Sequence, residues 1–451
     1  MTSRTFRLVL VLALLLVAGG ALVWMKFRKP EPASFILVTI DTLRADRLGC
    51  YGYKRNITPG LDRLASEGIL FDQAFCVMPT TLPSHGSIFF GTWPRIHGST
   101  SNFIQFSGNK LPFLSRLLQQ AGYSTAAFLG THHLGKHLQP LGGFDRLDFP
   151  EDDRKASDTL AIVRKWFANR KDDKQFFVWI HLWDPHSPYA LHPKFIEKIR
   201  PGYKGEFPQK FGFIPRDFYT PEQVQVMKDL YDNEIAYTDF HLTKFLDDFR
   251  KTHDARDTTI IIASDHGETL DELVSSQDYA FDHGEFLYEH QIRVPLLILS
   301  PRETAGRRIQ RTVTLLDVMP TVLKQANLPV PATCQGASLA PYLKGRDNDG
   351  PDQLVFLQRR DFSTPPRPFL AGRQYAVREH FYKLFYDEAN RRSTLYSNKE
   401  EYIEAQQPKI AQTLEQRLQQ WLKQTEPLMQ KPGQSVSEEE AQKLRELGYV
   451  Q

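Results

Sequence analysis

Short apolar runs alternate with helix-like segments from residue 33 to residue 300. Their β-branched and aromatic residues are typical of buried strands; they occupy residues 35–40, 124–129, 175–182, 259–263 and 294–299. One helix is predicted to begin at Thr58-Pro59, an N-cap followed by a first-turn proline, and another covers residues 111–120. The alternation predicts an α/β fold, with a mostly parallel sheet sandwiched between helices.

The pattern changes near residue 345. Residues 344–351 are rich in Gly, Asp and Pro and predict a connection, and β-like runs follow at 354–357 and 381–386. A later segment has apolar residues at helical spacing, namely Ile410, Leu414, Leu418, Trp421 and Leu422. We therefore predict a catalytic domain over residues 31–345 and a small C-terminal α+β subdomain with a tail helix over residues 346–451. The second part shows no evident chemistry and is expected to serve packing.

The N-terminus is of a different kind. Residues 8–25 form an apolar run of about 18 residues, just enough for a helix to cross a ~30 Å hydrocarbon core. No clear cleavage site follows, so an uncleaved membrane anchor within residues 1–30 is favoured over a removed signal peptide. Basic residues flank the run on both sides, so the distribution of positive charge does not settle its orientation.

Bulk properties narrow the possible functions. A chain of 451 residues can hold one large α/β domain and a smaller appendage. Its net charge of +3 is too small to indicate nucleic-acid binding. The three cysteines, Cys50, Cys76 and Cys334, are too widely spaced to form a disulfide framework, and the absence of a CxxC pair argues against a cysteine-based zinc site.

Metal-binding side chains follow two of the predicted strands. Asp265 and His266 come directly after residues 259–263, and Asp41 comes directly after residues 35–40. Because the carboxyl ends of parallel strands meet at one edge of a sheet, we expect these side chains to lie together. Carboxylate with imidazole suits zinc or manganese, whereas carboxylate oxygens alone suit calcium or magnesium. The sequence thus predicts a divalent metal ion, with zinc, manganese and calcium left open.

A combination of motifs resembles the sulfatase branch of the alkaline phosphatase superfamily. Asp41 to Asp46 resembles its first metal motif, residues 81–85 its nucleophile segment, and residues 264–268 its second metal motif. Later landmarks also match, at Tyr288-Glu289, Arg293 to Pro295, Asp317, Pro320-Thr321, Gly336, Ser338-Leu339 and residues 444–449. The resemblance covers nearly the whole chain beyond the N-terminal run and implies a metal-dependent ester hydrolase.

The chain departs from that family at positions that carry the chemistry. Family sulfatases have Cys or Ser, then x-Pro-x-Arg, and convert the first residue to formylglycine; here Thr81 and His85 occupy these positions. Thr42 replaces the second aspartate of the first metal motif, and Thr131 replaces a lysine. Unmodified threonine is the nucleophile in phosphodiesterase-like and headgroup-transferring relatives, so the resemblance implies that Thr81 attacks the ester and also contacts the metal.

Six further side chains are considered, five of them as candidates for the active site. His186 lies in a loop that resembles the family's histidine-bearing loop and is expected to contact the ester or protonate its leaving group. His283 is expected to contact an oxyanion or to bind a second metal, and Asp184 with His186 is an alternative second-metal pair. His85 is expected beside the nucleophile, Asn102 resembles an active-site asparagine, and His181 is interpreted as a core histidine; these three complete the set.

Several functions therefore stay open. We expect attack on a phosphate or phosphonate ester, or on a sulfate ester, through Thr81. The alternatives are a true sulfuric ester hydrolase without formylglycine, a membrane-linked transferase of phosphorylated headgroups, and a degenerate sulfatase-fold binding protein. The expected partners are the membrane and an ester substrate linked to a lipid or glycan, with the catalytic domain in the periplasm or outside the cell. Substrate identity and oligomeric state are not determined.

Overall fold

The computed structural model describes residues 33–106, 111–171, 173–205, 209–301, 306–360, 371–399, 403, 406–429, 435–439, 441 and 442. From Ser34 onward, these residues belong to one compact unit. The predicted membrane anchor at residues 8–25 lies outside the described residues. No helix within the described ranges combines the length and the apolar character needed to cross a membrane.

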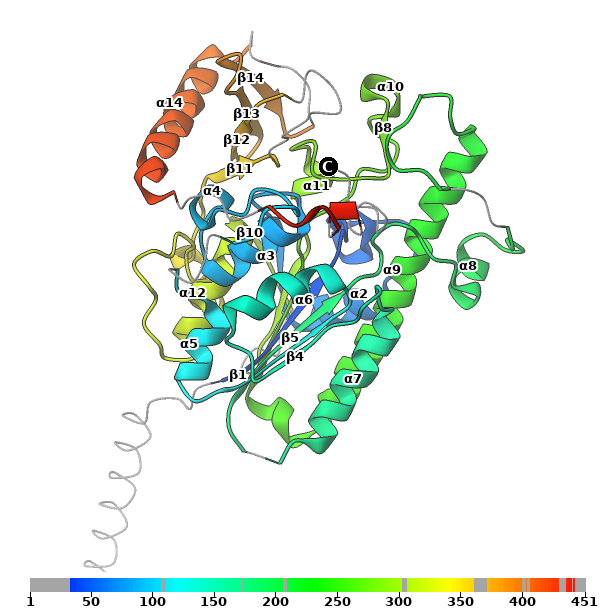
Figure 1. Ribbon diagram of the computed structural model, residues 1–451, viewed down its shortest axis with the longest axis vertical. Helices are drawn as coiled ribbons and strands as arrows, with labels where there is room; N and C mark the ends of the chain where they lie inside the picture. Colours follow the sequence, from blue (N-terminus) through cyan, green and yellow to red (C-terminus); the bar gives the residue numbers. More distant parts are fainter. Residues whose placement is uncertain are drawn as a thin grey trace, which may run out of the picture. The chain divides into compact units, whose positions relative to one another are not determined.

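An eight-stranded sheet forms the centre of this unit (Figure 1). Its strands, in spatial order, are β10 (Arg307–Thr314), β2 (Ile69–Phe75), β9 (Leu296–Leu299), β7 (Thr258–Ser264), β1 (Ser34–Ile40), β5 (Phe176–Leu182), β3 (Ser124–Leu129) and β4 (Arg146–Asp148). Only β9 runs antiparallel to its neighbours, β2 and β7. The prediction of a mostly parallel sheet is confirmed.

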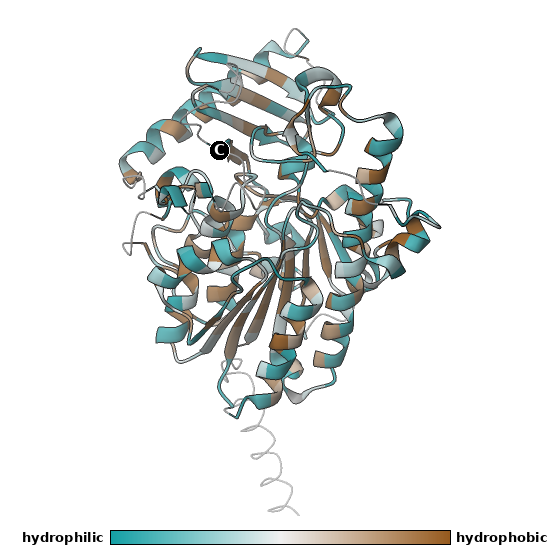
Figure 2. Ribbon diagram, turned by 45° about the vertical axis from the view of Figure 1, so that its right-hand side comes forward, coloured by the Kyte–Doolittle hydropathy of each residue, from teal (hydrophilic) through white to brown (hydrophobic). Residues whose placement is uncertain are grey.

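Helices cover both faces of this sheet, and its strands form the apolar centre seen in Figure 2. One face packs against α2 (Pro59–Glu67), α7 (Ala156–Asn169) and α9 (Pro221–Phe249). The other face packs against a layer built from α3 (Thr81–Phe90), α5 (Leu114–Gln120) and α12 (Val318–Gln325). Strand side chains alternate between the faces, so Val178 of β5 joins the α7 and α9 core while Trp179 packs against Phe89 of α3.

Helix α9 has 29 residues and is not predicted from the apolar pattern. Its start is well specified, because Thr220 and Gln223 form a capping box and Pro221 occupies the first turn. Polar residues are buried along its middle, including Asp232, Asn233 and Glu234. These residues interrupt the apolar stripe on which a sequence-based helix prediction depends.

A second, antiparallel sheet lies at the top of Figure 1, covered by α14 (Pro408–Thr425). It contains β11 (Val355–Gln358), β12 (Gln374–Glu379), β13 (Tyr382–Asp387) and β14 (Arg392–Ser397), in that order. The predicted C-terminal α+β subdomain is confirmed.

The shorter elements connect and border these layers. They are α4 (Pro94–His97), α6 (His132–Leu138), α8 (Pro193–Ile199), α10 (Val274–Gln277), α11 (Glu289–Ile292), α13 (Ala340–Leu343), β6 (Gly212–Phe213) and β8 (Tyr279–Ala280). The last two strands pair with each other in a small antiparallel sheet.

Trp421 of α14 is one of the contacts between the C-terminal subdomain and the catalytic part of the chain. The Trp421 ring stacks on the Phe356 ring with centroids 4.9 Å apart, and the Trp93 ring lies 5.4 Å from it. The Arg95 guanidinium lies 5.1 Å from the centroid of the Trp421 ring. Burial of an aromatic ring among other rings stabilises a fold through both apolar area and ring geometry.

We predict that Trp421→Ala lowers the free energy of unfolding by about 3–5 kcal/mol, the range for truncating a buried aromatic side chain. Gln420→Ala, at an exposed neighbouring position of the same helix, is the matched control and should change it by less than about 0.5 kcal/mol. Denaturant titration of both variants measures the difference. Equal stability of the two variants would show that the ring cluster is not an anchor.

Candidate active site

Strand register places the two acidic residues beside each other. β1 pairs in parallel with β7, with Ile40 opposite Ser264, so Asp41 and Asp265 leave their strands at the same level. On its other side β1 pairs with β5, with Thr39 opposite His181. The carboxyl ends of three adjacent strands therefore meet at one edge of the sheet, which is where open α/β sheets form their sites.

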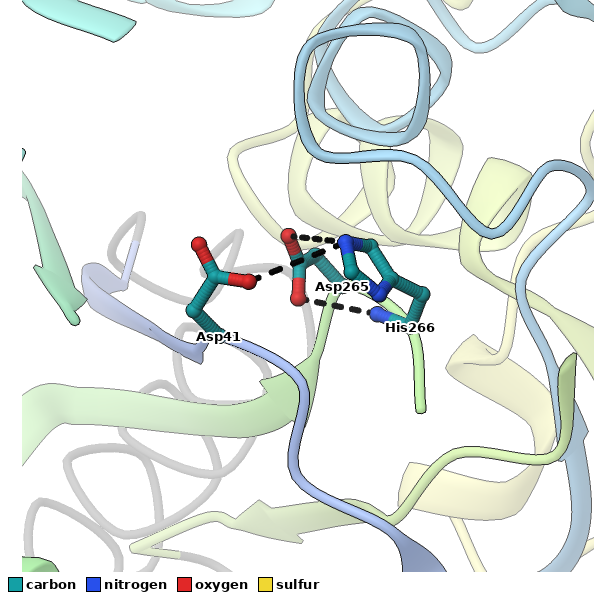
Figure 3. A group of neighbouring side chains, drawn as sticks. All are labelled: Asp41, Asp265 and His266. Atoms are coloured by element: carbon teal, nitrogen blue, oxygen red, sulfur yellow. Dashed lines mark hydrogen bonds and ion pairs between the residues drawn. The ribbon is translucent and has the colours of Figure 1, made fainter. Parts of the chain in front are cut away.

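Asp41, Asp265 and His266 form one buried group (Figure 3). The Nε2 atom of His266 lies 3.7 Å from Oδ1 of Asp41 and 3.5 Å from Oδ2 of Asp265. Nδ1 of His266 lies 3.0 Å from the carbonyl oxygen of Gly267, which can only accept, so Nδ1 carries the proton. In the neutral ring, the Nε2 lone pair therefore faces the carboxylates, as required of a metal ligand.

The electrostatics of this group also suit a cation. Burial raises the pKa of Asp41 well above its usual value, and the nearby Glu268 carboxylate raises it further. Burial also raises the pKa of Asp265, and the charge of Asp41 raises it further. Neither Asp41 oxygen has a hydrogen-bond partner among the described residues, nor has Oδ2 of Asp265. Buried, unpaired carboxylates are costly, and a divalent cation would offset that cost.

Thr81 is the first residue of α3, and its hydroxyl points to the same group. Its Oγ1 lies 3.2 Å from Nε2 of His266. Because that nitrogen presents a lone pair, the threonine hydroxyl is the donor in this hydrogen bond. The side-chain oxygen of Asn102 accepts a 2.8 Å hydrogen bond from the backbone N–H of Leu82 and so fixes the start of the helix. Thr81 thus lies beside the acidic group, and Asn102 contacts the start of the same helix; their roles in the reaction stay predictions.

His85, the residue at the family's arginine position, lies one turn further along α3. Its Nδ1 donates to the carbonyl oxygen of Thr81 at 2.8 Å, and its Nε2 lies 3.0 Å from the Thr39 hydroxyl. Both ring nitrogens are therefore engaged within the protein. It lies beside Thr81, as predicted, and its contacts are those of a residue that positions α3.

The tautomer of His85 also determines how His181 is oriented. The Thr39 oxygen accepts from Nε1 of Trp179 and donates to the unprotonated Nε2 of His85. The Thr39 oxygen also lies 3.0 Å from Nδ1 of His181, and since its own proton is already donated, Nδ1 of His181 must be the donor in this hydrogen bond. The lone pair on its Nε2 therefore faces Oδ2 of Asp41 at 3.4 Å. Sequence reasoning interpreted His181 as a core histidine; it is buried, but it also borders the acidic group.

His186 and His283 lie near His266. Their ring centroids are 5.2 Å apart, and the His283 ring is 4.3 Å from the His266 ring. His186 stacks on Trp183 with a centroid distance of 3.8 Å, which fixes the plane of its ring. Burial lowers the pKa of His283 to about 4, so the ring is neutral near pH 7. The structure thus brings both predicted histidines close to His266 of the buried acidic group.

Arg44 joins the two loops that carry the acidic residues. Its Nη1 donates to the carbonyl oxygen of Glu268 at 3.0 Å and to Glu272 at 2.6 Å, while Nη2 binds Asp46 at 2.7 Å. Arg44 is buried, whereas its partners Asp46 and Glu272 are exposed, so the network has a buried cation and a solvent-facing carboxylate side. It holds the loop after β1 against the loop after β7.

Thr42, which departs from the family pattern, and the buried Cys76 have distinctive surroundings. Thr42 has φ +53°, an outlier for a β-branched residue, and its backbone N–H donates to Oδ1 of Asp265 at 3.3 Å. Strain of this kind is retained where it serves a site. Cys76 lies 3.7 Å from the carbonyl oxygen of Gln291, and burial raises the pKa of its thiol well above the usual value. Cys76 is thus not set up as a thiolate nucleophile.

Arg360 is a residue that sequence reasoning missed, because the C-terminal part shows no motif. It is buried and forms an ion pair with Glu285. A Cβ atom at Gly284 would lie 3.1 Å from Cδ of Arg360 and 3.2 Å from Oγ1 of Thr80. Arg360 therefore lies against the His283 loop and close to the start of α3. The one local signal is that it lies a few residues after the β-like run at 354–357.

Asp184 and His186 were considered as a pair of ligands for a second metal, but the structure groups Asp184 with other residues. It forms a separate buried group with His192 and Glu234. His186 instead directs Nδ1 to the carbonyl oxygen of Ser187 at 2.5 Å.

Comparison with known proteins places this geometry in a family. The family model described as Sulfatase matches residues 33–328, and a model described as N-sulphoglucosamine sulphohydrolase, C-terminal, matches residues 277–428. An N-acetylglucosamine-6-O-sulfatase of Bacteroides thetaiotaomicron is 26% identical, over 86% of this chain and 84% of that protein. The N-acetylgalactosamine-6-sulfatase of Homo sapiens is also 26% identical, over 74% and 69%.

Solved structures with the same fold include proteins named for different substrates. A phosphonate monoester hydrolase of Agrobacterium radiobacter has a TM-score of 0.73 at 18% identity and covers 87% of this chain and 96% of its own. A protein in complex with its substrate D-glucosamine-2-N,6-O-disulfate has a TM-score of 0.72 at 21% identity, with coverages of 87% and 98%. The first family model alone spans more than half of the 451 residues, and the chain therefore belongs to the sulfatase family of hydrolases.

Proposed function

We propose that this protein hydrolyses a phosphate or phosphonate ester through attack by Thr81, with a divalent cation held by Asp41, Asp265 and His266. The observation that carries the proposal is the 3.2 Å contact between Oγ1 of Thr81 and Nε2 of His266 inside this group. His181 directs a lone pair to the same space and is a further ligand candidate. A cation bound there would supply Lewis acidity for both the ester oxygen and the threonine hydroxyl.

The residues of the chain then divide the chemistry between them. Thr81 Oγ1 gives its proton to water and forms a bond to phosphorus, while the bond to the leaving-group oxygen breaks and that oxygen takes up a proton from water. A second water then attacks phosphorus, cleaves the threonine ester and returns a proton to Oγ1, which restores the hydroxyl. His283 is neutral because burial lowers its pKa, so its one N–H can donate to an ester oxygen. His186 is neutral for the same reason, but its proton lies on Nδ1 and is donated to the carbonyl oxygen of Ser187, so only the Nε2 lone pair can face a group that donates. Arg360 supplies positive charge beside the start of α3 and favours an anionic substrate.

A sulfate ester is the second candidate substrate. Its support comes from the relatives, which include sulfatases of glucosamine and galactosamine derivatives. The absence of a cysteine or serine at position 81 weighs against it, since the family's formylglycine is made from those residues. The fold itself is compatible with both ester types, because a phosphonate monoester hydrolase has it too.

We predict that Thr81→Ala reduces hydrolysis by about a thousandfold or more while the fold is retained, because the nucleophile is lost. Thr81→Ser, which keeps a hydroxyl, is the matched control and should retain measurable turnover. Aryl phosphodiester, phosphonate, phosphomonoester and sulfate esters, compared side by side, measure the effect and identify the ester class. Full activity in the alanine variant would exclude Thr81 as the nucleophile.

We predict that Asp265→Asn raises the cation concentration needed for half-maximal activity by roughly 100-fold or more, because one ligand loses its charge. The assay uses chelator-treated protein titrated with zinc, manganese and calcium in turn. Asp247→Asn, a surface carboxylate paired with Arg63, is the control and should behave as the wild type. An unchanged cation requirement in Asp265→Asn would place the metal elsewhere.

We also propose that residues 8–25 hold the protein in a membrane with the catalytic part on the extracytoplasmic side. The support is the length of this apolar run and the family's work on exported or environmental esters. A phosphatase reporter that is active only outside the cytoplasm, fused to the C-terminus, should give signal. A fluorescent reporter that matures only inside the cell should not, and the reverse pattern would overturn this topology.

A further inference from the structure

A second group of metal-binding side chains lies where three elements meet. Asp184 is in the loop after β5, His192 is the residue before α8, and Glu234 lies in the middle of α9. All three side chains are buried. Their nearest ligand atoms lie within 4.8 Å of one another. The group contains none of the residues assigned to the Thr81 site.

Each carboxylate in this group is oriented by a backbone N–H. Oδ2 of Asp184 accepts from Ala156 at 2.6 Å, and Oε1 of Glu234 accepts from Ala190 at 2.8 Å. Oε2 of Glu234 has no hydrogen-bond partner among the described residues, and neither has Nε2 of His192. Glu234 is only 2% exposed, so water does not readily satisfy that oxygen. The unsatisfied atoms thus belong to the same buried group.

The imidazole between the two carboxylates is held rigidly. The His192 ring stacks on Tyr237 with centroids 3.7 Å apart and an interplanar angle of 5°. Asn233 accepts from the backbone N–H of His192 at 3.3 Å and donates to the carbonyl oxygen of Ala190 at 2.8 Å. The side chains are therefore fixed before any ligand binds, as is typical of built metal sites.

The distances indicate a bound cation better than a hydrogen-bonded ion pair. Nε2 of His192 lies 3.9 Å from Oδ1 of Asp184 and 3.9 Å from Oε1 of Glu234. A charged imidazole that donated to either carboxylate would be about 2.7–2.9 Å away. Two ligands of one cation, bonded at about 2.0–2.3 Å, are separated by roughly 3.3–3.8 Å in a tetrahedral arrangement. The observed 3.9 Å between Nε2 of His192 and each carboxylate oxygen is close to the separation expected of two ligands of one cation.

We propose that Asp184, His192 and Glu234 bind a second divalent cation of the zinc type, separate from the one at Asp41. One imidazole with two carboxylates is a donor set that suits zinc, with manganese next. The cation joins α9 to the loop that carries His186, since His186 lies between Asp184 and His192 in the chain. The site stands independently of the proposed hydrolysis; only its effect on His186 rests on that proposal.

The test counts metal in the full chain purified in detergent. Protein is stripped with chelator, loaded with zinc, freed of excess and analysed by mass spectrometry of the metal. We expect about two zinc ions per chain in the wild type, and about one each in Glu234→Gln, His192→Gln and Asp265→Asn. His241→Gln removes another imidazole of α9, one that contacts Tyr237 outside the group, and should keep about two.

The Asp265→Asn protein keeps the test valid if the substitutions at the second group prevent folding. Its remaining zinc should show, by X-ray absorption, one imidazole nitrogen among oxygen ligands. Folded Asp265→Asn protein without zinc would overturn the second site, as would zinc content in Glu234→Gln equal to that of the wild type. Two zinc ions in Asp265→Asn protein would instead count against the Asp41 site, so the two proposals fail separately.

Discussion

The parallel pairing of β1 with β7 and β5 is the constraint on which the site depends. It sets Ile40 level with Ser264 and with Leu182, so the residues that follow these strands are brought to one edge. Helices on both faces hold the register, because a slip of one residue would turn every strand side chain to the opposite face. Asp41 would then point away from Asp265, and the buried acidic group would not form.

That edge gathers carboxyl groups that are buried from solvent. Asp41, Asp265 and Glu268 are all fully buried, and burial raises the pKa of each. The fold partly offsets this through Arg44, which binds the backbone of one loop from the other. A cation is the natural complement of the remaining charge, and the start of α3 brings the Thr81 hydroxyl to the same point.

The buried histidines act through fixed tautomers. Hydrogen bonds to backbone carbonyl oxygens assign the proton of His266 to Nδ1 and that of His85 to Nδ1. Because the Thr39 hydroxyl donates to Nε2 of His85, it accepts from Nδ1 of His181, which therefore carries the proton of that ring. This chain of hydrogen bonds leaves the Nε2 lone pair of His181 directed toward Asp41. Burial lowers the pKa of all three rings, which keeps them neutral and preserves these directions.

The sequence by itself determined the parallel sheet, the C-terminal α+β part and the grouping of Asp41 with Asp265 and His266. Those features depend on local apolar runs, which can be read from the amino-acid sequence alone, and on the general rule that the carboxyl ends of parallel strands lie at one edge of a sheet. The antiparallel direction of β9, the length of α9, the position of Arg360 and the group of Asp184 with His192 and Glu234 were decided only by the tertiary structure. Each depends on side chains from segments distant in the sequence that satisfy one another in a buried place, and no local pattern records such partners.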